Sequence, residues 1–66
     1  MYAIGIDIGG TKVAGALVDE NGAIIREARV ATPVSDPVAL VDAVVGLVTD
    51  LRAGEKVLGV GVAMAG

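Results

Sequence analysis

The stretch Ile4-Gly5-Ile6-Asp7-Ile8-Gly9-Gly10-Thr11-Lys12 is the segment around which the remaining sequence is arranged. Its first half has the alternation of a strand, whose successive side chains point to opposite faces. One face then carries Ile4, Ile6 and Ile8, and the other carries Ala3, Gly5 and Asp7. Because a carboxylate is costly to bury without a partner, Asp7 predicts that this second, nearly bare face borders a cleft holding water, a cation or a ligand.

The residues after this strand are typical of a phosphate-binding turn. Gly9 and Gly10 allow backbone dihedrals and close approaches that a Cβ atom would forbid. Successive N–H groups in such a turn form a concavity that binds phosphate. Thr11 adds a hydroxyl group, which can serve either the phosphate or the turn itself, and Lys12 adds a positive charge.

The string Asp7-Ile8-Gly9-Gly10-Thr11-Lys12 resembles the first phosphate motif of ROK-family sugar kinases, the bacterial glucokinase group of the actin/hexokinase/Hsp70 superfamily. The resemblance extends over all 66 residues, as far as the final Gly-Val-Gly-Val-Ala-Met-Ala-Gly. It implies an α/β fold of the ribonuclease-H-like, actin-like ATPase type. Residues 1–66 would form an incomplete, N-terminal part of that domain, with the remainder of the kinase absent.

The resemblance also implies a reaction, namely transfer of the γ-phosphoryl group of ATP to a hexose, with the 6-hydroxyl of glucose as the first choice. Asp7 would help to hold Mg²⁺ through water, while the phosphates would be held by Gly9, Gly10, Thr11 and Lys12. Gly66 would begin a loop that approaches the sugar. The general base, the sugar motif and a possible structural zinc site are expected beyond residue 66, so these residues alone are predicted to be inactive.

Other nucleotide motifs are missing from the chain. It contains neither G-x-x-x-x-G-K-[ST] nor a G-x-G-x-x-G that opens a helix. Its glycine turn joins two strands, whereas those motifs place the phosphate on a helix N-terminus.

Composition excludes several classes of function. A net charge of −3 with five basic residues argues against a nucleic-acid partner, because backbone binding needs clustered Lys and Arg. The lack of Cys and His excludes the usual zinc ligands within this stretch. No apolar run reaches the ~18 residues of a membrane span. We expect a cytoplasmic protein that is a homo-oligomer when complete. The apolar sheet, with an unpaired edge at its last strand, predicts that these residues are a piece of a longer chain.

The remaining elements follow from periodicity and turn signals. Strands are predicted over residues 2–8, 13–19, 23–31 (an edge strand) and 57–63. Asn21-Gly22 predicts a type I′ hairpin, and Ser35 or Asp36 should cap a helix that has Pro37 in its first turn, runs to Arg52 and is ended by Gly54. Its sheet-facing stripe should be Leu40, Val44, Leu47, Val48 and Leu51. The helix crossover makes the last strand parallel to the first, with sheet order 3-2-1-4.

The last strand is predicted to have two unlike faces. Leu58, Val60 and Val62 fall on one face, and the small-residue face carries Val57, Gly59, Gly61 and Ala63.

Three other functions remain open. A sugar-responsive ROK repressor carries a helix-turn-helix first, and a strand that starts at residue 2 leaves no room for one unless the chain was trimmed. The second alternative is another enzyme of the same superfamily, such as an N-acylmannosamine kinase or an activating ATPase. A purely structural module does not explain why Asp, Gly-Gly, Thr and Lys converge at one strand end.

Overall fold

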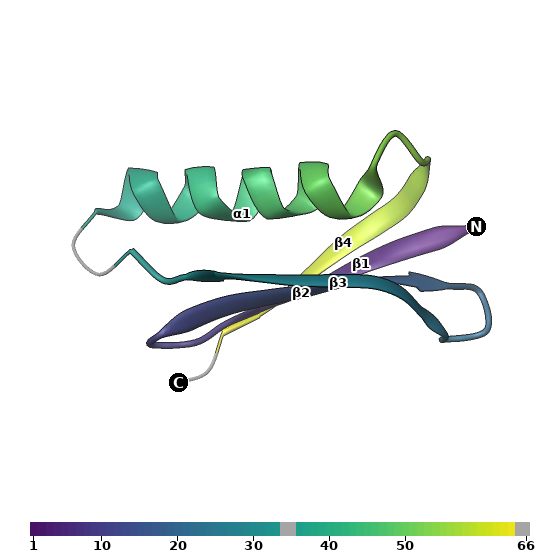
Figure 1. Ribbon diagram of the computed structural model, residues 1–66, viewed down its shortest axis with the longest axis horizontal. Coiled ribbons are helices and arrows are strands. Elements are labelled where there is room, and N and C mark those ends of the chain that lie inside the picture. Colours follow the sequence, from purple (N-terminus) through teal and green to yellow (C-terminus); the bar gives the residue numbers. More distant parts are fainter. Residues whose placement is uncertain (34–35, 65–66) are drawn as a thin grey trace.

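The computed structural model describes residues 1–33 and 36–64, which form one mixed sheet with one helix on one of its faces (Figure 1). In chain order the elements are β1 (Tyr2–Ile8), β2 (Lys12–Asp19), β3 (Ile24–Ala31), α1 (Pro37–Arg52) and β4 (Val57–Met64). The sheet order is β3-β2-β1-β4. β1 pairs antiparallel with β2 and parallel with β4, and β2 pairs antiparallel with β3. The predicted order and the edge position of β3 are therefore confirmed.

The core lies between α1 and the sheet. It consists of Ile4 and Ile6 from β1, Val13 and Leu17 from β2, and Leu47 and Leu51 from α1. Around it pack the half-buried members of the predicted helical stripe, Leu40, Val44 and Val48. The helix contacts β1, β2 and β3 most, so the large apolar side chains of β4 after Val57 stay exposed.

The start of α1 follows the predicted capping signals. The Asp36 carboxylate accepts a hydrogen bond from the Val38 N–H at 3.0 Å, and Pro37 occupies the first helical position, where its missing N–H costs nothing. Asp36 is thus the N-cap. The alternative cap, Ser35, lies outside the described residues.

The loop between β2 and β3 differs from the predicted type I′ hairpin. Among the described loop residues only Gly22 has a positive φ, at 82°, whereas a type I′ turn requires it at Asn21 as well. The Gly22 N–H donates to the Asp19 carbonyl at 3.0 Å, and the Asp19 carboxylate accepts the N–H groups of Asn21 and Ala23. These bonds favour a longer loop, a turn followed by one left-handed glycine, so β3 begins at Ile24 instead of residue 23.

The helix ends at Arg52, as predicted, but two details differ, one just after the helix and one in the last strand. Ala53, rather than Gly54 alone, takes the left-handed conformation after the helix, with φ 47°. In β4, Tyr2 pairs with Val57 but Ile4 pairs with Val60, so one extra residue bulges between the two pairs. The bulge turns Val57 toward the core and away from the small-residue face assigned to it by simple alternation.

Candidate phosphate-binding turn and adjoining groove

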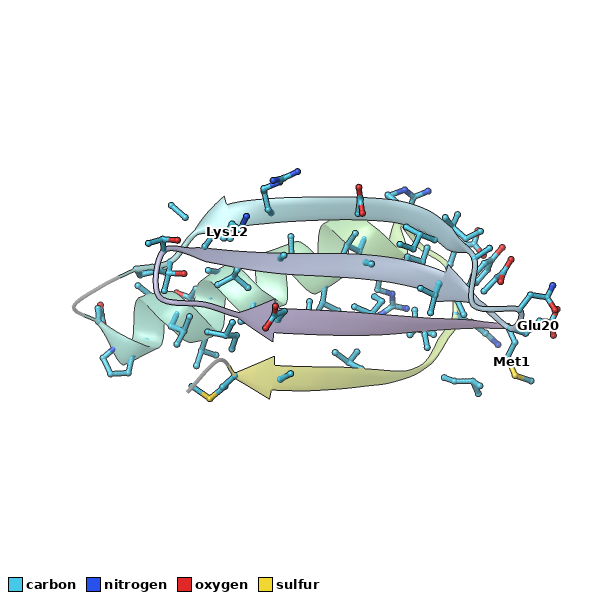
Figure 2. The ribbon with its side chains drawn as sticks, turned by 90° about the horizontal axis from the view of Figure 1, so that it is seen from below. Met1, Lys12 and Glu20 are labelled. Atoms are coloured by element: carbon cyan, nitrogen blue, oxygen red, sulfur yellow. The ribbon has the colours of Figure 1, made fainter. Side chains whose placement is uncertain are left out.

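The glycine turn lies at the sheet edge where three strands end. β1, β3 and β4 run parallel to one another, so their carboxyl ends lie along the same edge of the sheet. This is the edge at which the chain turns from β1 into β2. Lys12 marks this edge in Figure 2. In open α/β sheets such an edge is the usual place for a ligand.

Asp7 is exposed on the sheet face opposite α1, a face that carries few side-chain atoms along β1 and β2 (Figure 2). Its pairing neighbours are Ala14 on β2 and Ala63 on β4. Together with other small residues they line a shallow groove of about 570 Å³. The lining on this face is Gly5, Asp7, Ala14, Ala16, Glu27, Gly61 and Ala63. The bare face of the first strand therefore borders an open groove, and a ligand held there stays a prediction.

Glu27 is a groove residue that the sequence did not single out. It pairs with Ala16 from the edge strand β3 and lines the same groove as Asp7. In the sequence it reads only as one of several charges that protect an edge strand. Its membership of the groove depends on the β2–β3 register, in which an irregularity between Leu17 and Val18 leaves Ile25 without a partner and restores the Ala16–Glu27 pair that a two-residue turn at Asn21-Gly22 would also give.

The two glycines of the turn serve different purposes. A Cβ atom on Gly9 would lie 3.1 Å from the Lys12 carbonyl oxygen, whereas one on Gly10 would meet no atom within 4 Å. Neither glycine has a positive φ, so of the two freedoms that glycine allows the turn uses the close approach and not the left-handed conformation. Gly9 is needed for the close approach of Lys12, because the Gly9 N–H donates to the Lys12 carbonyl at 2.9 Å. Gly10 leaves open space at the tip of the turn.

The backbone at this tip can bind an anion. Within residues 1–33 and 36–64, the N–H groups of Gly10 and Thr11 donate to no backbone or side-chain acceptor. Gly10, Thr11 and Lys12 are all exposed, so these donors and the Lys12 ammonium group can reach a phosphate from solvent. The structure thus brings together the five predicted residues at one strand end, while Gly66 lies outside the described residues.

Thr32 lies immediately after β3 and contacts the glycine turn between β1 and β2. Its hydroxyl donates to the Gly9 carbonyl at 2.9 Å, and its N–H donates to the Thr11 carbonyl at 3.1 Å. No local motif in the sequence marks it, because 23 residues separate Thr32 from Gly9.

A metal ion would find few protein ligands here. The described part of the chain has no group of three or more His, Cys, Asp or Glu side chains that could hold one. Asp7 alone suits an ion that takes its other ligands from water and phosphate, as Mg²⁺ commonly does.

Among the described residues, no helix has the length and apolarity needed to cross a membrane.

Comparison with known sequences decides the family, because the sequence model of the ROK family matches residues 3–66. The chain belongs to the ROK family. It is 46% identical over 63 residues to a glucokinase of Streptomyces coelicolor, covering 96% of this chain and 20% of that protein. It is 48% identical over 54 residues to an N-acetylmannosamine kinase of Salmonella newport, covering 80% of this chain and 19% of that one.

A solved structure shows the same arrangement of elements. The ROK-family glucokinase of Streptomyces griseus, crystallised with glucose and AMPPNP, superposes with a TM-score of 0.90 at 42% identity and covers all of this chain and 21% of its own. The mixed sheet with order 3-2-1-4 is therefore that of the actin-like ATPase kinases. This ROK chain spans about a fifth of the length of the curated relatives it matches.

Proposed function

We propose that residues 1–66 are the first part of the nucleotide-binding domain of an ATP-dependent sugar kinase, which transfers the γ-phosphoryl group of ATP to a hexose, with glucose as the preferred substrate. The observation that carries the proposal is the pair of N–H groups at Gly10 and Thr11, which donate to no acceptor among the described residues, in an exposed turn that follows the strand of the exposed Asp7. The glucokinase named above, with its bound glucose and ATP analogue, supports the choice of substrates.

Each residue of the turn has a role in this proposal. The N–H groups of Gly10 and Thr11, with the Lys12 ammonium group, would bind phosphate oxygens, and Gly9 would let the turn close. Asp7 would bind Mg²⁺ through water, and the ion would neutralise phosphate charge that develops during transfer. Positioning and neutralisation are most of what phosphoryl transfer requires from a protein. The general base, the remaining sugar contacts and a structural zinc site belong, on this proposal, to the part of the kinase beyond residue 66.

The test is release of ADP by the full-length protein with Mg-ATP and a panel of sugars: glucose, mannose, fructose, N-acetylglucosamine and N-acetylmannosamine. Asp7→Asn is expected to lower kcat/KM for the preferred sugar by at least about a hundredfold, by loss of charge stabilisation. Glu27→Gln is the matched control, since it removes the other carboxylate of the same groove. Turnover unchanged by Asp7→Asn, or lowered equally by both variants, would remove the metal role of Asp7.

N-acetylmannosamine is the second candidate substrate, because a relative that carries this name is 48% identical over 54 residues, against 46% over 63 residues for the glucokinase. Exclusive turnover of N-acetylmannosamine would replace glucose in the proposal. Sugar binding without any turnover would instead favour a sugar-responsive repressor.

A further inference from the structure

Thr32 donates hydrogen bonds to two carbonyl groups of the glycine turn. Because a peptide unit is planar, fixing a carbonyl also fixes the direction of the N–H group in the same unit. In a trans peptide unit the C=O and N–H bonds point in opposite directions. The Gly9 carbonyl, which accepts the Thr32 hydroxyl, shares a peptide unit with the Gly10 N–H. The Thr11 carbonyl, which accepts the Thr32 N–H, shares one with the Lys12 N–H. Both N–H groups therefore point away from β3.

The bond to Gly9 replaces one that an ordinary hairpin would form within itself. In a two-residue hairpin the residues that flank the loop exchange two backbone hydrogen bonds. Here the Gly9 N–H donates to the Lys12 carbonyl, but the Gly9 carbonyl accepts the Thr32 hydroxyl instead of the Lys12 N–H. Because the Thr32 hydroxyl takes the place of the Lys12 N–H on the Gly9 carbonyl, the turn is not closed by a hydrogen bond between those two groups.

Pro33 fixes the backbone from which Thr32 acts. A residue that precedes proline is restricted to extended conformations, and this continues the antiparallel pairing of β2 and β3 one residue beyond Ala31, as far as the bond between Thr32 and Thr11. The partly buried hydroxyl is then delivered to Gly9 from a strand end with little freedom.

We propose that Thr32 is a positioning residue: by holding the Gly9 carbonyl it orients the Gly10 N–H toward the nucleotide phosphates, and by holding the Thr11 carbonyl it fixes the other end of the turn. The role of Thr32 in phosphate binding rests on the sugar-kinase function proposed above. Its hydrogen bonds to the turn do not depend on that function. Only the hydroxyl bond can be removed by mutation, since the second bond comes from the backbone.

The test uses Thr32→Val, which keeps the side-chain shape and the backbone bond but loses the hydroxyl, and Thr32→Ser, which retains it. Thr49→Val is the matched control, because the Thr49 hydroxyl makes the same kind of bond, to the Val45 carbonyl at 2.9 Å, on the exposed side of α1. Two quantities are measured on the full-length protein: hydrogen exchange of the peptide that spans residues 8–13, and the affinity for Mg-AMPPNP by calorimetry, with KM for ATP where there is turnover.

Thr32→Val is expected to speed exchange in residues 8–13 and to weaken Mg-AMPPNP binding about tenfold, the effect of one lost hydrogen bond. KM for ATP should rise more than kcat falls, Thr32→Ser should restore both, and Thr49→Val should change neither. Unchanged exchange in Thr32→Val would overturn the hold on the turn whatever the enzyme does. Faster exchange with unchanged nucleotide affinity would overturn its link to phosphate binding. A wild-type protein that binds no nucleotide would overturn both that link and the proposed function, while exchange would still decide whether Thr32 holds the turn.

Discussion

Arg26 and Leu51 join the edge strand to the end of the helix: the Arg26 Nη1 donates a hydrogen bond to the Leu51 carbonyl oxygen at 2.6 Å. Leu51 lies in the last turn of α1, where carbonyls have no partner within the helix and a positive charge is favoured by the helix dipole. From the sequence, the charge of Arg26 is expected only to protect an edge strand from pairing with another chain. In the structure it also caps the C-terminal end of α1.

Arg26→Leu is expected to lower the free energy of unfolding of the full-length protein by about 1 kcal/mol, because a charge-assisted hydrogen bond and a favourable interaction with the helix end are lost. Arg29→Leu is the control, since it removes the same charge from the same strand. Thermal unfolding measured by calorimetry compares the two. Equal losses from both substitutions would mean that net charge, not the contact with Leu51, is responsible.

Gly15→Ala is expected to destabilise the protein by about 1–3 kcal/mol through overpacking. A Cβ atom at Gly15 would lie 2.7 Å from Leu51 Cδ1 and 2.8 Å from Ile6 Cδ1, in the centre of the core. Gly46→Ala is the matched substitution on α1, where a Cβ atom meets nothing within 4 Å, and it should stabilise by about 0.5–1 kcal/mol through helix propensity. Denaturant unfolding measures both, and a neutral Gly15→Ala would show that the core can relax around a methyl group.

Ala53→Gly is expected to stabilise the protein by about 0.5 kcal/mol. Ala53 has φ 47°, a left-handed conformation that costs a residue with a Cβ atom about 1–2 kcal/mol, and the greater freedom of glycine in the unfolded chain offsets part of the gain. The reverse change next to it, Gly54→Ala at φ 83°, should destabilise by about 1 kcal/mol. Melting temperatures that move in the same direction for both variants would contradict this account of the helix end.

Gly9→Ala and Gly10→Ala are expected to separate folding of the turn from binding of phosphate. Gly9→Ala should lower both the melting temperature and the nucleotide affinity, since its Cβ atom would crowd the Lys12 carbonyl. Gly10→Ala should keep stability within about 0.5 kcal/mol of wild type, yet lower the affinity for Mg-AMPPNP about tenfold by placing a methyl group beside the N–H donors. Wild-type affinity in Gly10→Ala would show that phosphate does not approach the tip of the turn.

The local order of this chain could be predicted because it depends on neighbours in the sequence. Alternation of Ile4, Ile6 and Ile8 marks a strand, the spacing of Leu47 and Leu51 marks the buried side of a helix, and Asp36-Pro37 marks its start. The same local information predicted the phosphate turn, since a run of glycines next to Thr and Lys has few structural uses. The strand order followed from the handedness of the helix crossover.

Sequence alone therefore determined which elements form and how they are ordered, and it indicated the turn where we propose that phosphate binds, because periodicity and turn chemistry act over a few residues. Only the tertiary structure decided what holds that turn and that helix in place. The contacts of Thr32 with Gly9 and of Arg26 with Leu51 join residues 23 and 25 positions apart, and the groove position of Glu27 and the inward turn of Val57 depend on strand register. A shift of one residue in pairing moves a side chain to the opposite face of a sheet, so such contacts exist only once the strands are aligned.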